Sequence, residues 1–545
     1  MKSKNLLLLL ICSMLYLNAS SQEKYFIAFT DKNGTQFSVD NPSEFLTQRS
    51  IERRAKQGIA ITERDLPVSQ SYIDEIEQLG VNILYSLKWF NGVIAVISTE
   101  EMVNNVLDKT FVNGVFMVFD SQAKGIPLAD EDFFQAYSSK ASPDDYYSYG
   151  ASAAQVKMMN GHKLHNLGFR GNGMRIAVFD SGFNSVNVMS AFDSLRSNNK
   201  IIYTKDFVNP TSNIYNEHYH GAIVLSAMAA NIPEVLVGTA PEAEYILIRS
   251  EDATSEQIIE EYNWAAAAEL ADSLGADVIN SSLGYYEFDS EWQNHTFSDM
   301  DGETTPSARA ANIAANVGMI VVASAGNEAN NEWGRIITPS DAFGAIAVGA
   351  VDSEGEYVSF SSVGPSADGR VKPDVVSMGY LTAVQQVSGE ISTANGTSLS
   401  APLVSGLISC LWQALPDASA EEIYNFTIRS ASQFSNPSPT LGYGIPDFEL
   451  ALNELPNFPR GEANLRLFPN PTNGKLTILI PCNNCNEMFL SLFDISGKQL
   501  VGEVISSTGN VINIDIPETY PEGVYFLRLI QGNNYYTGKF VKTSL

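Results

Sequence analysis

Short apolar runs alternate with longer alanine-rich stretches through the middle of the chain. Residues 174–179, 276–280 and 319–323 are apolar runs of strand length. Residues 255–274 and 307–317, which precede the last two of these runs, have the length of helices, and each is followed by a glycine. Such an alternation forms βαβ crossovers, in which the strands are parallel and the sheet is covered on both faces. The pattern therefore predicts an α/β fold built on a buried parallel sheet.

The hydrophobic pattern changes on both sides of this region. Residues 25–118 combine short apolar strands with helices at 42–57 and 71–79, which is typical of a small α+β unit. Residues 121–147 are polar and contain glycine, serine and proline, as linkers do. After residue 457, turn residues separate short alternating strands, which indicates a small β-sandwich. The strands expected there are 475–480, 489–493, 511–516, 524–529 and 539–541.

The first residues have the pattern of an export signal. Lys2 and Lys4 precede an apolar core at residues 6–17, and small residues follow it up to Ser21. This core is too short to span a membrane as a helix of the mature protein, and no later stretch reaches that length. We therefore predict a signal peptide and an exported, soluble mature protein.

A chain of 545 residues is too long for one ordinary domain. The changes in pattern predict a signal peptide, an α+β domain, a linker with the processing region, an α/β domain and a β-sandwich. We place them at residues 1–21, 22–120, 121–147, 148–455 and 462–545, respectively.

The charge of the chain narrows the classes of partner. The formal net charge is −29, and the apolar content of 44% is that of a globular protein. An acidic surface of this kind repels nucleic acid and anionic membranes. We therefore expect no nucleic-acid partner.

Three cysteines lie beyond the predicted signal peptide, at Cys410, Cys482 and Cys485. Cys410 lies in an apolar run and is expected as a buried thiol. The pair Cys482 and Cys485 has three interpretations, namely a small disulfide loop, half of a metal site, or two free thiols. Export favours the disulfide, and no second Cys or His pair lies nearby to complete a zinc site.

Ser398 stands where a glycine-led turn enters an apolar helix. Residues 395–398 read Asn-Gly-Thr-Ser, and the uncharged run that continues to about residue 415 has the length of a buried helix. The N–H groups at a helix start are unpaired and stabilise negative charge beside the hydroxyl. Pro402 is expected in the first turn, where its missing N–H has no helical partner to lose. Taken alone, the pattern is also typical of an ordinary N-cap serine.

Three other positions supply what a serine needs to attack an amide. Asp180 ends a predicted strand and His220 begins an apolar helix, so the carboxylate can orient the imidazole as a general base. Asn327 follows Ala-Gly at the end of another strand and offers an N–H to an oxyanion. Each residue alone has an ordinary structural interpretation, and His218 is an alternative base two positions before His220. The order Asp, His, Ser at strand ends and helix starts nevertheless favours a catalytic triad.

The motifs around these residues resemble the subtilisin-like (subtilase) serine endopeptidases over about residues 148–452. They are IAVFDSG at 176–182, HG at 220–221, NSSLG at 280–284, ASAGNE at 323–328 and NGTS at 395–398. The resemblance implies a doubly wound parallel sheet and peptide-bond hydrolysis through an acyl-enzyme. The site residues that it implies are Asp180, His220 and Ser398 as the triad, Asn327 as the oxyanion donor, and Ser282, Leu283, Gly284, Ser324, Ala325, Gly326 and Ile337 as substrate-binding residues.

The resemblance also gives roles to the flanking domains. The α+β domain occupies the place of an inhibitory propeptide that assists folding. The C-terminal domain, with Pro-Asn-Pro at 469–471 and a terminal strand at 539–542, resembles the type A sorting domain of the Gram-negative type IX secretion system. An ordinary accessory β-domain is the alternative.

The implied partners are polypeptide substrates, the chain's own propeptide and the outer-membrane secretion machinery. The implied location is outside the cell or on its surface, reached through the periplasm and the outer membrane of a Gram-negative bacterium. No cofactor is required, and structural calcium is permitted by the resemblance although no clear calcium loop is present.

The leading hypothesis is a secreted serine endopeptidase of broad specificity. The branched Ile337 is expected to shorten the specificity pocket and so to favour small to medium apolar residues before the cleaved bond. A catalytically weak cell-surface adhesin on the same fold is the alternative. An acyl hydrolase of another class is disfavoured, because Gly-x-Ser-x-Gly is absent around Ser398.

Overall fold

The computed structural model describes residues 22–125, 127, 132–137, 145–453, 463–480, 488–495, 499–505, 511–531 and 534–543. The predicted signal peptide and the pair Cys482 and Cys485 lie outside these residues. Within the described ranges, no helix combines the length and the apolar character that crossing a membrane requires.

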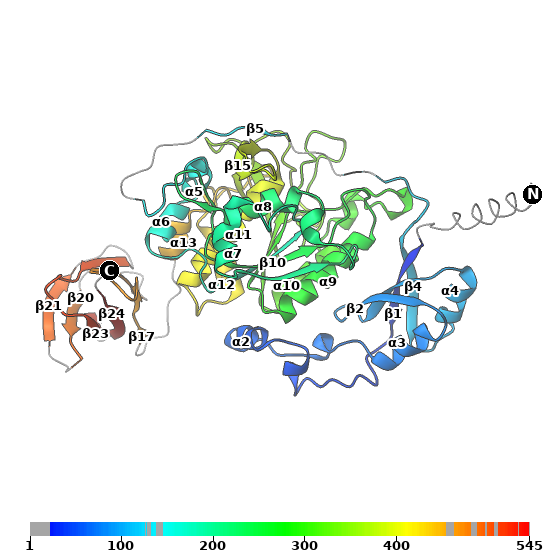
Figure 1. Ribbon diagram of the computed structural model, residues 1–545, viewed down its shortest axis with the longest axis horizontal. Helices are drawn as coiled ribbons and strands as arrows, with labels where there is room; N and C mark the ends of the chain where they lie inside the picture. The colour runs from blue at the N-terminus through cyan, green and yellow to red at the C-terminus, as the bar shows by residue number, and fades with distance from the viewer. Residues whose placement is uncertain are drawn as a thin grey trace, which may run out of the picture.

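A seven-stranded sheet forms the centre of the molecule (Figure 1). Every neighbouring pair in it is parallel. The strand order reverses beside β6, and crevices at the carboxyl ends of strands near such a reversal receive ligands. The predicted doubly wound parallel sheet is therefore confirmed. Its strands in spatial order are β14 (Val375–Met378), β13 (Ala345–Val351), β12 (Ile320–Ser324), β11 (Val278–Ser281), β6 (Arg175–Asp180), β10 (Glu244–Arg249) and β7 (Ile201–Asp206).

Helices cover both faces of this sheet. Ile176 and Val178 of β6 belong to one core with α8 (His220–Ala229) and α11 (Thr397–Ala414). Ala177 and Phe179 belong to the opposite core, with α9 (Ile259–Ser273) and α10 (Pro306–Asn316). This alternation is the signature of a strand that is buried on both sides. Shorter elements around the sheet are α5 (Ala153–Lys157), α6 (Gly161–Asn166), α7 (Asp193–Ser197), β8 (Asn231–Ile232), β9 (Leu236–Val237), α12 (Ala420–Arg429) and α13 (Phe448–Asn453).

The N-terminal unit is a four-stranded antiparallel sheet that lies against α9 (Figure 1). On its outer face Ile76 and Val106, from two helices, pack with Ile27 and Val93 of the sheet. On its inner face Phe26, Trp89 and Ile94 join the core that contains Trp264 of α9. The elements are β2 (Asn82–Leu87), β3 (Gly92–Val96), β1 (Lys24–Phe29) and β4 (Val112–Phe119), with α3 (Gln70–Glu77) and α4 (Glu100–Leu107).

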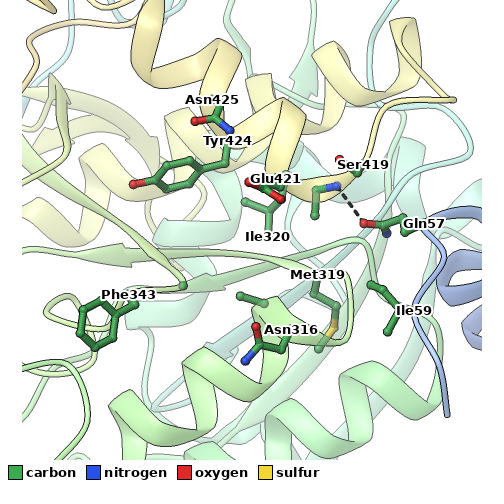
Figure 2. A pocket seen from close by; sticks show the side chains of 13 residues that line it. Gln57, Ile59, Asn316, Met319, Ile320, Phe343, Ser419, Glu421, Tyr424 and Asn425 are labelled. Atoms are coloured by element: carbon green, nitrogen blue, oxygen red, sulfur yellow. Dashed lines mark hydrogen bonds between the residues drawn. The ribbon is translucent and has the colours of Figure 1, made fainter.

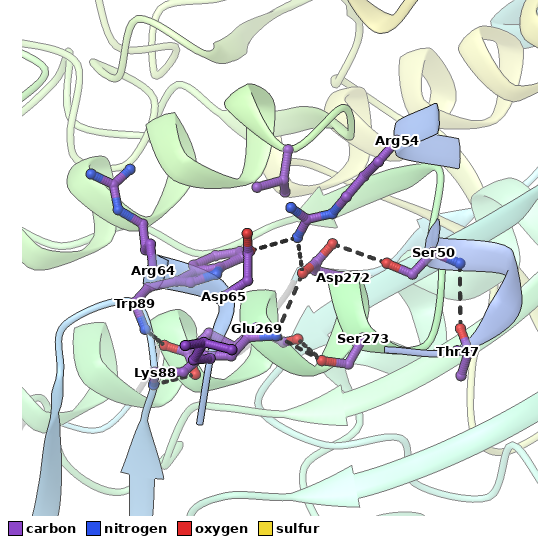
Figure 3. Close-up of polar contacts among 12 residues, drawn as sticks. Thr47, Ser50, Arg54, Arg64, Asp65, Lys88, Trp89, Glu269, Asp272 and Ser273 are labelled. Atoms are coloured by element: carbon purple, nitrogen blue, oxygen red, sulfur yellow. Dashed lines mark hydrogen bonds and ion pairs between the residues drawn. The ribbon is translucent and has the colours of Figure 1, made fainter. Parts of the chain in front are cut away.

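A buried polar cluster completes this interface (Figure 3). Asp272 of α9 forms ion pairs with Arg53 at 2.6 Å, Arg54 at 2.7 Å and Lys88 at 3.5 Å. Its neighbour Glu269 accepts the backbone N–H groups of Lys88 and Trp89, each at 2.8 Å. Burial opposes ionisation of Asp272, but the three cations hold its pKa below the usual value. The N-terminal unit is thus fixed to the central domain by charge as well as by apolar contact.

The prediction of one helix at 42–57 is wrong. The structure has a 3₁₀ turn, η1 (Pro42–Glu44), and then a separate helix, α2 (Gln48–Lys56). Thr47 starts α2, because its side chain accepts the N–H of Ser50.

The C-terminal unit contains a five-stranded and a three-stranded sheet (Figure 1). Leu476 and Ile478 of the smaller sheet share one core with Leu490, Leu527 and Phe540 of the larger. The predicted small β-sandwich is confirmed for the described residues. Its strands are β17 (Ala463–Asn464), β24 (Asn534–Lys542), β23 (Gly523–Gln531), β20 (Met488–Phe493) and β21 (Gln499–Ile505) in one sheet, and β18 (Arg466–Phe468), β19 (Lys475–Leu479) and β22 (Val511–Asp515) in the other.

The stretch predicted as a linker contains a short strand. This strand, β5 (Phe134–Gln135), pairs with β16 (Ile391–Ala394), and β16 also pairs with β15 (Thr382–Gln385).

Candidate active site

Asp180 and His220 form a hydrogen-bonded pair at the carboxyl end of β6. Asp180 is the last residue of that strand and is fully buried, and its Oδ1 lies 2.7 Å from Nδ1 of His220, the first residue of α8. The N–H of Ser181 donates to the same oxygen at 2.8 Å. A carboxylate in this position favours the tautomer with the proton on Nδ1, which leaves Nε2 for proton transfer.

His218, the rival base, lies in the same cleft but has a different partner. Its Nδ1 is 3.0 Å from the hydroxyl of Ser181, and its ring stacks beside that of His220 with the centroids 6.5 Å apart. The buried carboxylate therefore orients His220, and a hydroxyl orients His218.

Ser398 is the second residue of α11. Gly396 is the N-cap, with φ of +151°, and a Cβ at this glycine would lie only 2.7 Å from the Ser398 hydroxyl. Ser398 Oγ is buried and, among the described residues, has no hydrogen-bond partner. The backbone N–H of Ser398 belongs to the helix-start groups that have no intrahelical partner. Ser398 thus presents an unbonded hydroxyl and an unpaired helix-start N–H side by side.

Pro402 lies inside α11, and the expectation that it belongs to the first turn is wrong. It stands four residues after Ser398, so it cannot donate the helical hydrogen bond to the Ser398 carbonyl. The hydroxyl of Ser282 donates to that carbonyl instead, at 2.7 Å. The side chain of Asn280, at the end of β11, donates to the same hydroxyl at 3.2 Å. Ser282 therefore supports the start of the helix that carries Ser398.

Asn327 presents its amide nitrogen beside Ser398. Its Oδ1 accepts the backbone N–H and the hydroxyl of Thr397, at 2.9 and 3.0 Å. These two donors fix the orientation of the side-chain amide, and Nδ2 is left as its donor group. A Cβ at Gly396 would lie 3.7 Å from this Nδ2, next to the space beside the Ser398 hydroxyl.

His220, Asn327 and Ser398 face a cleft of about 490 Å³, and Asp180 lies buried behind His220. Ile337 lies between its two glycine-bearing walls, because a Cβ at Gly284 or Gly326 would lie 2.5 or 3.0 Å from Ile337 Cδ1. Ala325 is fully buried and is the one predicted substrate-binding residue that does not line the cleft. The predicted residues that line it are His220, Ser282, Leu283, Gly284, Ser324, Gly326, Asn327, Ile337 and Ser398, and the others are Asp132, His218, Glu251, Glu328, Asn395 and Thr397.

Glu251 is a cleft residue that the sequence reasoning missed. It is 2% exposed and accepts the hydroxyl of Tyr285 at 3.0 Å. Burial raises the pKa of Glu251 to about 8, and the Tyr285 hydrogen bond opposes this rise. Its place two residues after the end of β10, next to β6 in the sheet, is the sequence signal that points to it.

Glu251, Glu256 and Glu260 bring one carboxylate oxygen each within 4.8 Å of one another. Burial raises the pKa of all three. Glu260 already accepts the N–H groups of Asp252 and Gln257. Glu256 Oε1 is buried and, among the described residues, has no hydrogen-bond partner. Carboxylate oxygens are the ligands that Ca²⁺ prefers, and we assign no metal to this cluster.

A second cavity, of about 510 Å³, lies at the amino ends of the strands, opposite the cleft (Figure 2). Ile320, which lines it, begins β12, whereas Ser324, which lines the cleft beside Ser398, ends the same strand. Gln57 reaches into this region and accepts the N–H of Ala420 at 2.8 Å. None of the predicted site residues lines this cavity.

A model described as the subtilase family matches residues 171–444, half of the chain. The chain belongs to the subtilase family. Two further models match this subtilase, the peptidase S8 propeptide domain of Bacteroidota at residues 24–130 and a secretion system C-terminal sorting domain at 466–543. The predicted family, propeptide and sorting domain are therefore confirmed. The chain is a serine peptidase by family, and the sorting domain indicates export, to the cell surface or beyond.

Relatives of this subtilase include proteins from bacteria and plants. It is 27% identical to Subtilisin NAT of Bacillus subtilis subsp. natto over 54% of its own length and 70% of that protein. It is 25% identical to M-protease of Shouchella clausii (strain KSM-K16) over 79% of its length and 92% of that protein. It is 27% identical to Subtilisin-like protease SBT6.1 of Arabidopsis thaliana over 53% of its length, but the match spans only 26% of the plant protein.

Proposed function

We propose that this subtilase is a secreted serine endopeptidase of broad specificity, with Asp180, His220 and Ser398 as its triad. The observation that supports this most is the 2.7 Å contact of the buried Asp180 with His220, which lines the same cleft as Ser398. Most of the predicted substrate-binding residues line that cleft. An unactivated amide requires this combination of nucleophile, base and orienting carboxylate.

In the proposed reaction, Ser398 Oγ attacks the carbonyl carbon of the substrate while His220 Nε2 accepts the hydroxyl proton. Asp180 remains ionised and stabilises the imidazolium. The backbone N–H of Ser398 and the Nδ2 amide of Asn327 donate to the oxyanion. His220 then gives its proton to the leaving amine, and water hydrolyses the acyl-enzyme by the same steps.

The test is Ser398→Ala in the full chain. Removing this hydroxyl deletes the nucleophile and is expected to lower casein turnover about 10⁶-fold, a magnitude that comes from subtilisin itself, a relative of this chain. The fold should be retained, and a serine-directed phosphonate should label the wild type and not the variant. A variant that still hydrolyses casein at the wild-type rate would contradict the assignment, and an unlabelled, inactive wild type would favour a binding protein.

The flanking units have proposed roles in maturation and export. In our proposal, residues 22–120 inhibit the catalytic unit at 148–455 until the region 121–147 is cut, and residues 1–21 direct export to the periplasm. Residues 462–545 direct passage through the outer membrane of a Gram-negative bacterium. None of the proposed catalytic residues lies in this last segment, so its deletion should leave an active enzyme inside the cell envelope. Normal levels of the truncated enzyme in the culture medium would contradict the sorting role.

A further inference from the structure

A short segment of the chain lies along its own catalytic cleft. Asp132 lines the cleft together with His220 and Ser398. The two residues of β5 that follow shortly after it pair with β16, which ends at Ala394, four residues before Ser398. The region predicted as a linker therefore leads from the cleft onto the neighbouring strand.

The register of this pairing gives the direction in which the segment is bound. Phe134 lies opposite Thr393 and Gln135 lies opposite Ser392. As the residue numbers rise along β5, its partners on β16 move away from Ser398. The segment after Asp132 therefore runs away from Ser398 towards its carboxyl end. The residues that follow the cleaved bond of a substrate would run in the same direction.

The position of Phe133 agrees with this direction. Its ring centroid lies 6.1 Å from that of Tyr219, the residue before His220. In the proposed reaction His220 gives its proton to the leaving amine, so the leaving part of a substrate lies on the side of His220. Phe133 is partly buried against the core, whereas the side chain of Phe134 is 43% exposed. Phe133 is thus the ring of the two that is partly buried and in contact with Tyr219.

β16 is suited to bind a peptide along its length. One of its edges is paired with β15, and the other, among the described residues, is paired only with the two residues of β5. A strand edge offers a row of backbone N–H and C=O groups, which an extended peptide can occupy whatever its sequence. Recognition by backbone pairing leaves selectivity to side-chain contacts such as the one between Phe133 and Tyr219.

We propose that the edge of β16 that β5 occupies and the ring of Tyr219 bind the part of a polypeptide substrate that follows the cleaved bond. Tyr219 selects an aromatic residue at the position of Phe133, and the segment 132–135 is the first occupant of this site. The inference rests on the proposed function, which it extends to the leaving side of the substrate.

Two quenched peptides of equal composition test the inference. Both carry one acyl-side sequence that the enzyme cleaves, followed by Asp-Phe-Ala-Gln in one and Asp-Ala-Phe-Gln in the other. An aromatic pair contributes enough to favour the first peptide about three- to tenfold in kcat/KM. Product masses show that both are cut at the same bond. A ratio of one, or a preference for the second peptide, would overturn the inference.

Variants of Tyr219 distinguish recognition by its ring from a general loss of activity. Tyr219→Phe keeps the ring and should retain the ratio, while Tyr219→Leu should bring it close to one. An unchanged ratio in Tyr219→Leu would overturn the assignment of the pocket. If the wild type cleaves neither the peptides nor casein, the proposed function fails; if it cleaves both peptides equally, only this inference fails.

Discussion

A histidine can act as the base of a triad only if its second nitrogen is held by a group that stabilises the imidazolium. At the scale of single residues, this requirement favours His220 over His218 as the base. The carboxylate of Asp180 lies beside Nδ1 of His220, whereas only the Ser181 hydroxyl lies beside Nδ1 of His218. His220→Ala should therefore lose nearly all casein hydrolysis, about 10⁶-fold, whereas His218→Ala should keep most of it. Circular dichroism of both variants controls for folding. The opposite pattern of activity would move the base to His218.

Ile337 is expected to limit the size of the residue before the cleaved bond. Its side chain lies between Gly284 and Gly326, so it fills the space between the two walls of the cleft. Ile337→Gly should raise kcat/KM for Phe relative to Ala at that position by roughly tenfold, since each methylene of pocket space is worth about 1–3 kcal/mol. Ile337→Val removes one methyl group and should give a smaller change. The kcat/KM values of both variants are measured with peptidyl p-nitroanilides. If the ratio of the Phe to the Ala value does not change, Ile337 does not form the base of the specificity pocket.

The placement of the candidate site residues at the ends of buried elements was largely readable in the sequence. Asp180, His220, Asn327 and Ser398 follow buried strands or begin buried helices, and the ends of such elements meet at one edge of a parallel sheet. Glu251 was missed because a glutamate in a polar loop gives no sign of burial. Its raised pKa comes from burial, which exists only once the chain has folded.

At the scale of elements, α11 depends on a hydrogen bond from outside the helix. Pro402 cannot donate to the Ser398 carbonyl, and the Ser282 hydroxyl does so instead. Ser282→Ala should leave this buried acceptor without a partner and lower the free energy of unfolding by about 1–3 kcal/mol. In a Pro402→Ala background, Ser282→Ala should lower the free energy of unfolding by less, because residue 402 then donates its own N–H to the Ser398 carbonyl.

The measurement is denaturant unfolding of the two single variants and the double variant. All are made on Ser398→Ala, which prevents self-digestion and keeps the backbone carbonyl. The double-mutant cycle should show a coupling energy of at least about 0.5 kcal/mol. Additive effects would mean that the helix does not use the two groups as alternatives.

The sequence predicted long periodic elements better than short or capped ones. The helices at 255–274 and 307–317 appear as α9 and α10. The prediction of one helix at 42–57 was wrong, because Thr47 was not identified as the N-cap of a separate helix within this charged stretch. The strand β5 was also missed, since two residues become a strand only by pairing with β16, more than 250 positions away.

At the scale of the whole molecule, the docking of the N-terminal unit was not predictable from the sequence. The sequence indicated an α+β unit, but the charges of α2 had no partner until the fold brought them to Asp272 of α9 (Figure 3). A buried pair of this kind adds little net stability by itself, but removing one member leaves the other charge buried and unpaired. The interface is therefore sensitive to changes of protonation in its polar cluster.

Glu269 should make this interface pH-dependent. Burial raises its pKa to about 7, and Lys88 and the two backbone N–H groups oppose the rise. Because the pKa in the folded chain lies above the ordinary 4.5, the stability linked to this proton is complete below about pH 4.5. It is lost as the pH rises through about 7. Between pH 5 and 8, Glu269 should lower the free energy of unfolding by about 2 kcal/mol.

The pH effect is measured by denaturant unfolding of the full chain, as Ser398→Ala, with and without Glu269→Gln. Glutamine does not titrate, so the difference in stability between pH 5 and pH 8 should be smaller in that variant. It should also be less stable at pH 5, because the amide nitrogen cannot accept a hydrogen bond and one of the N–H groups of Lys88 and Trp89 then loses its acceptor, whereas both oxygens of a protonated carboxyl keep lone pairs. Glu77→Gln, at an exposed position of α3, is the matched control and should keep the full pH dependence. If Glu269→Gln kept it as well, the loss of stability with rising pH would have to arise from the other buried carboxyls, such as Glu251, and docking of the N-terminal unit would not be linked to a proton on Glu269.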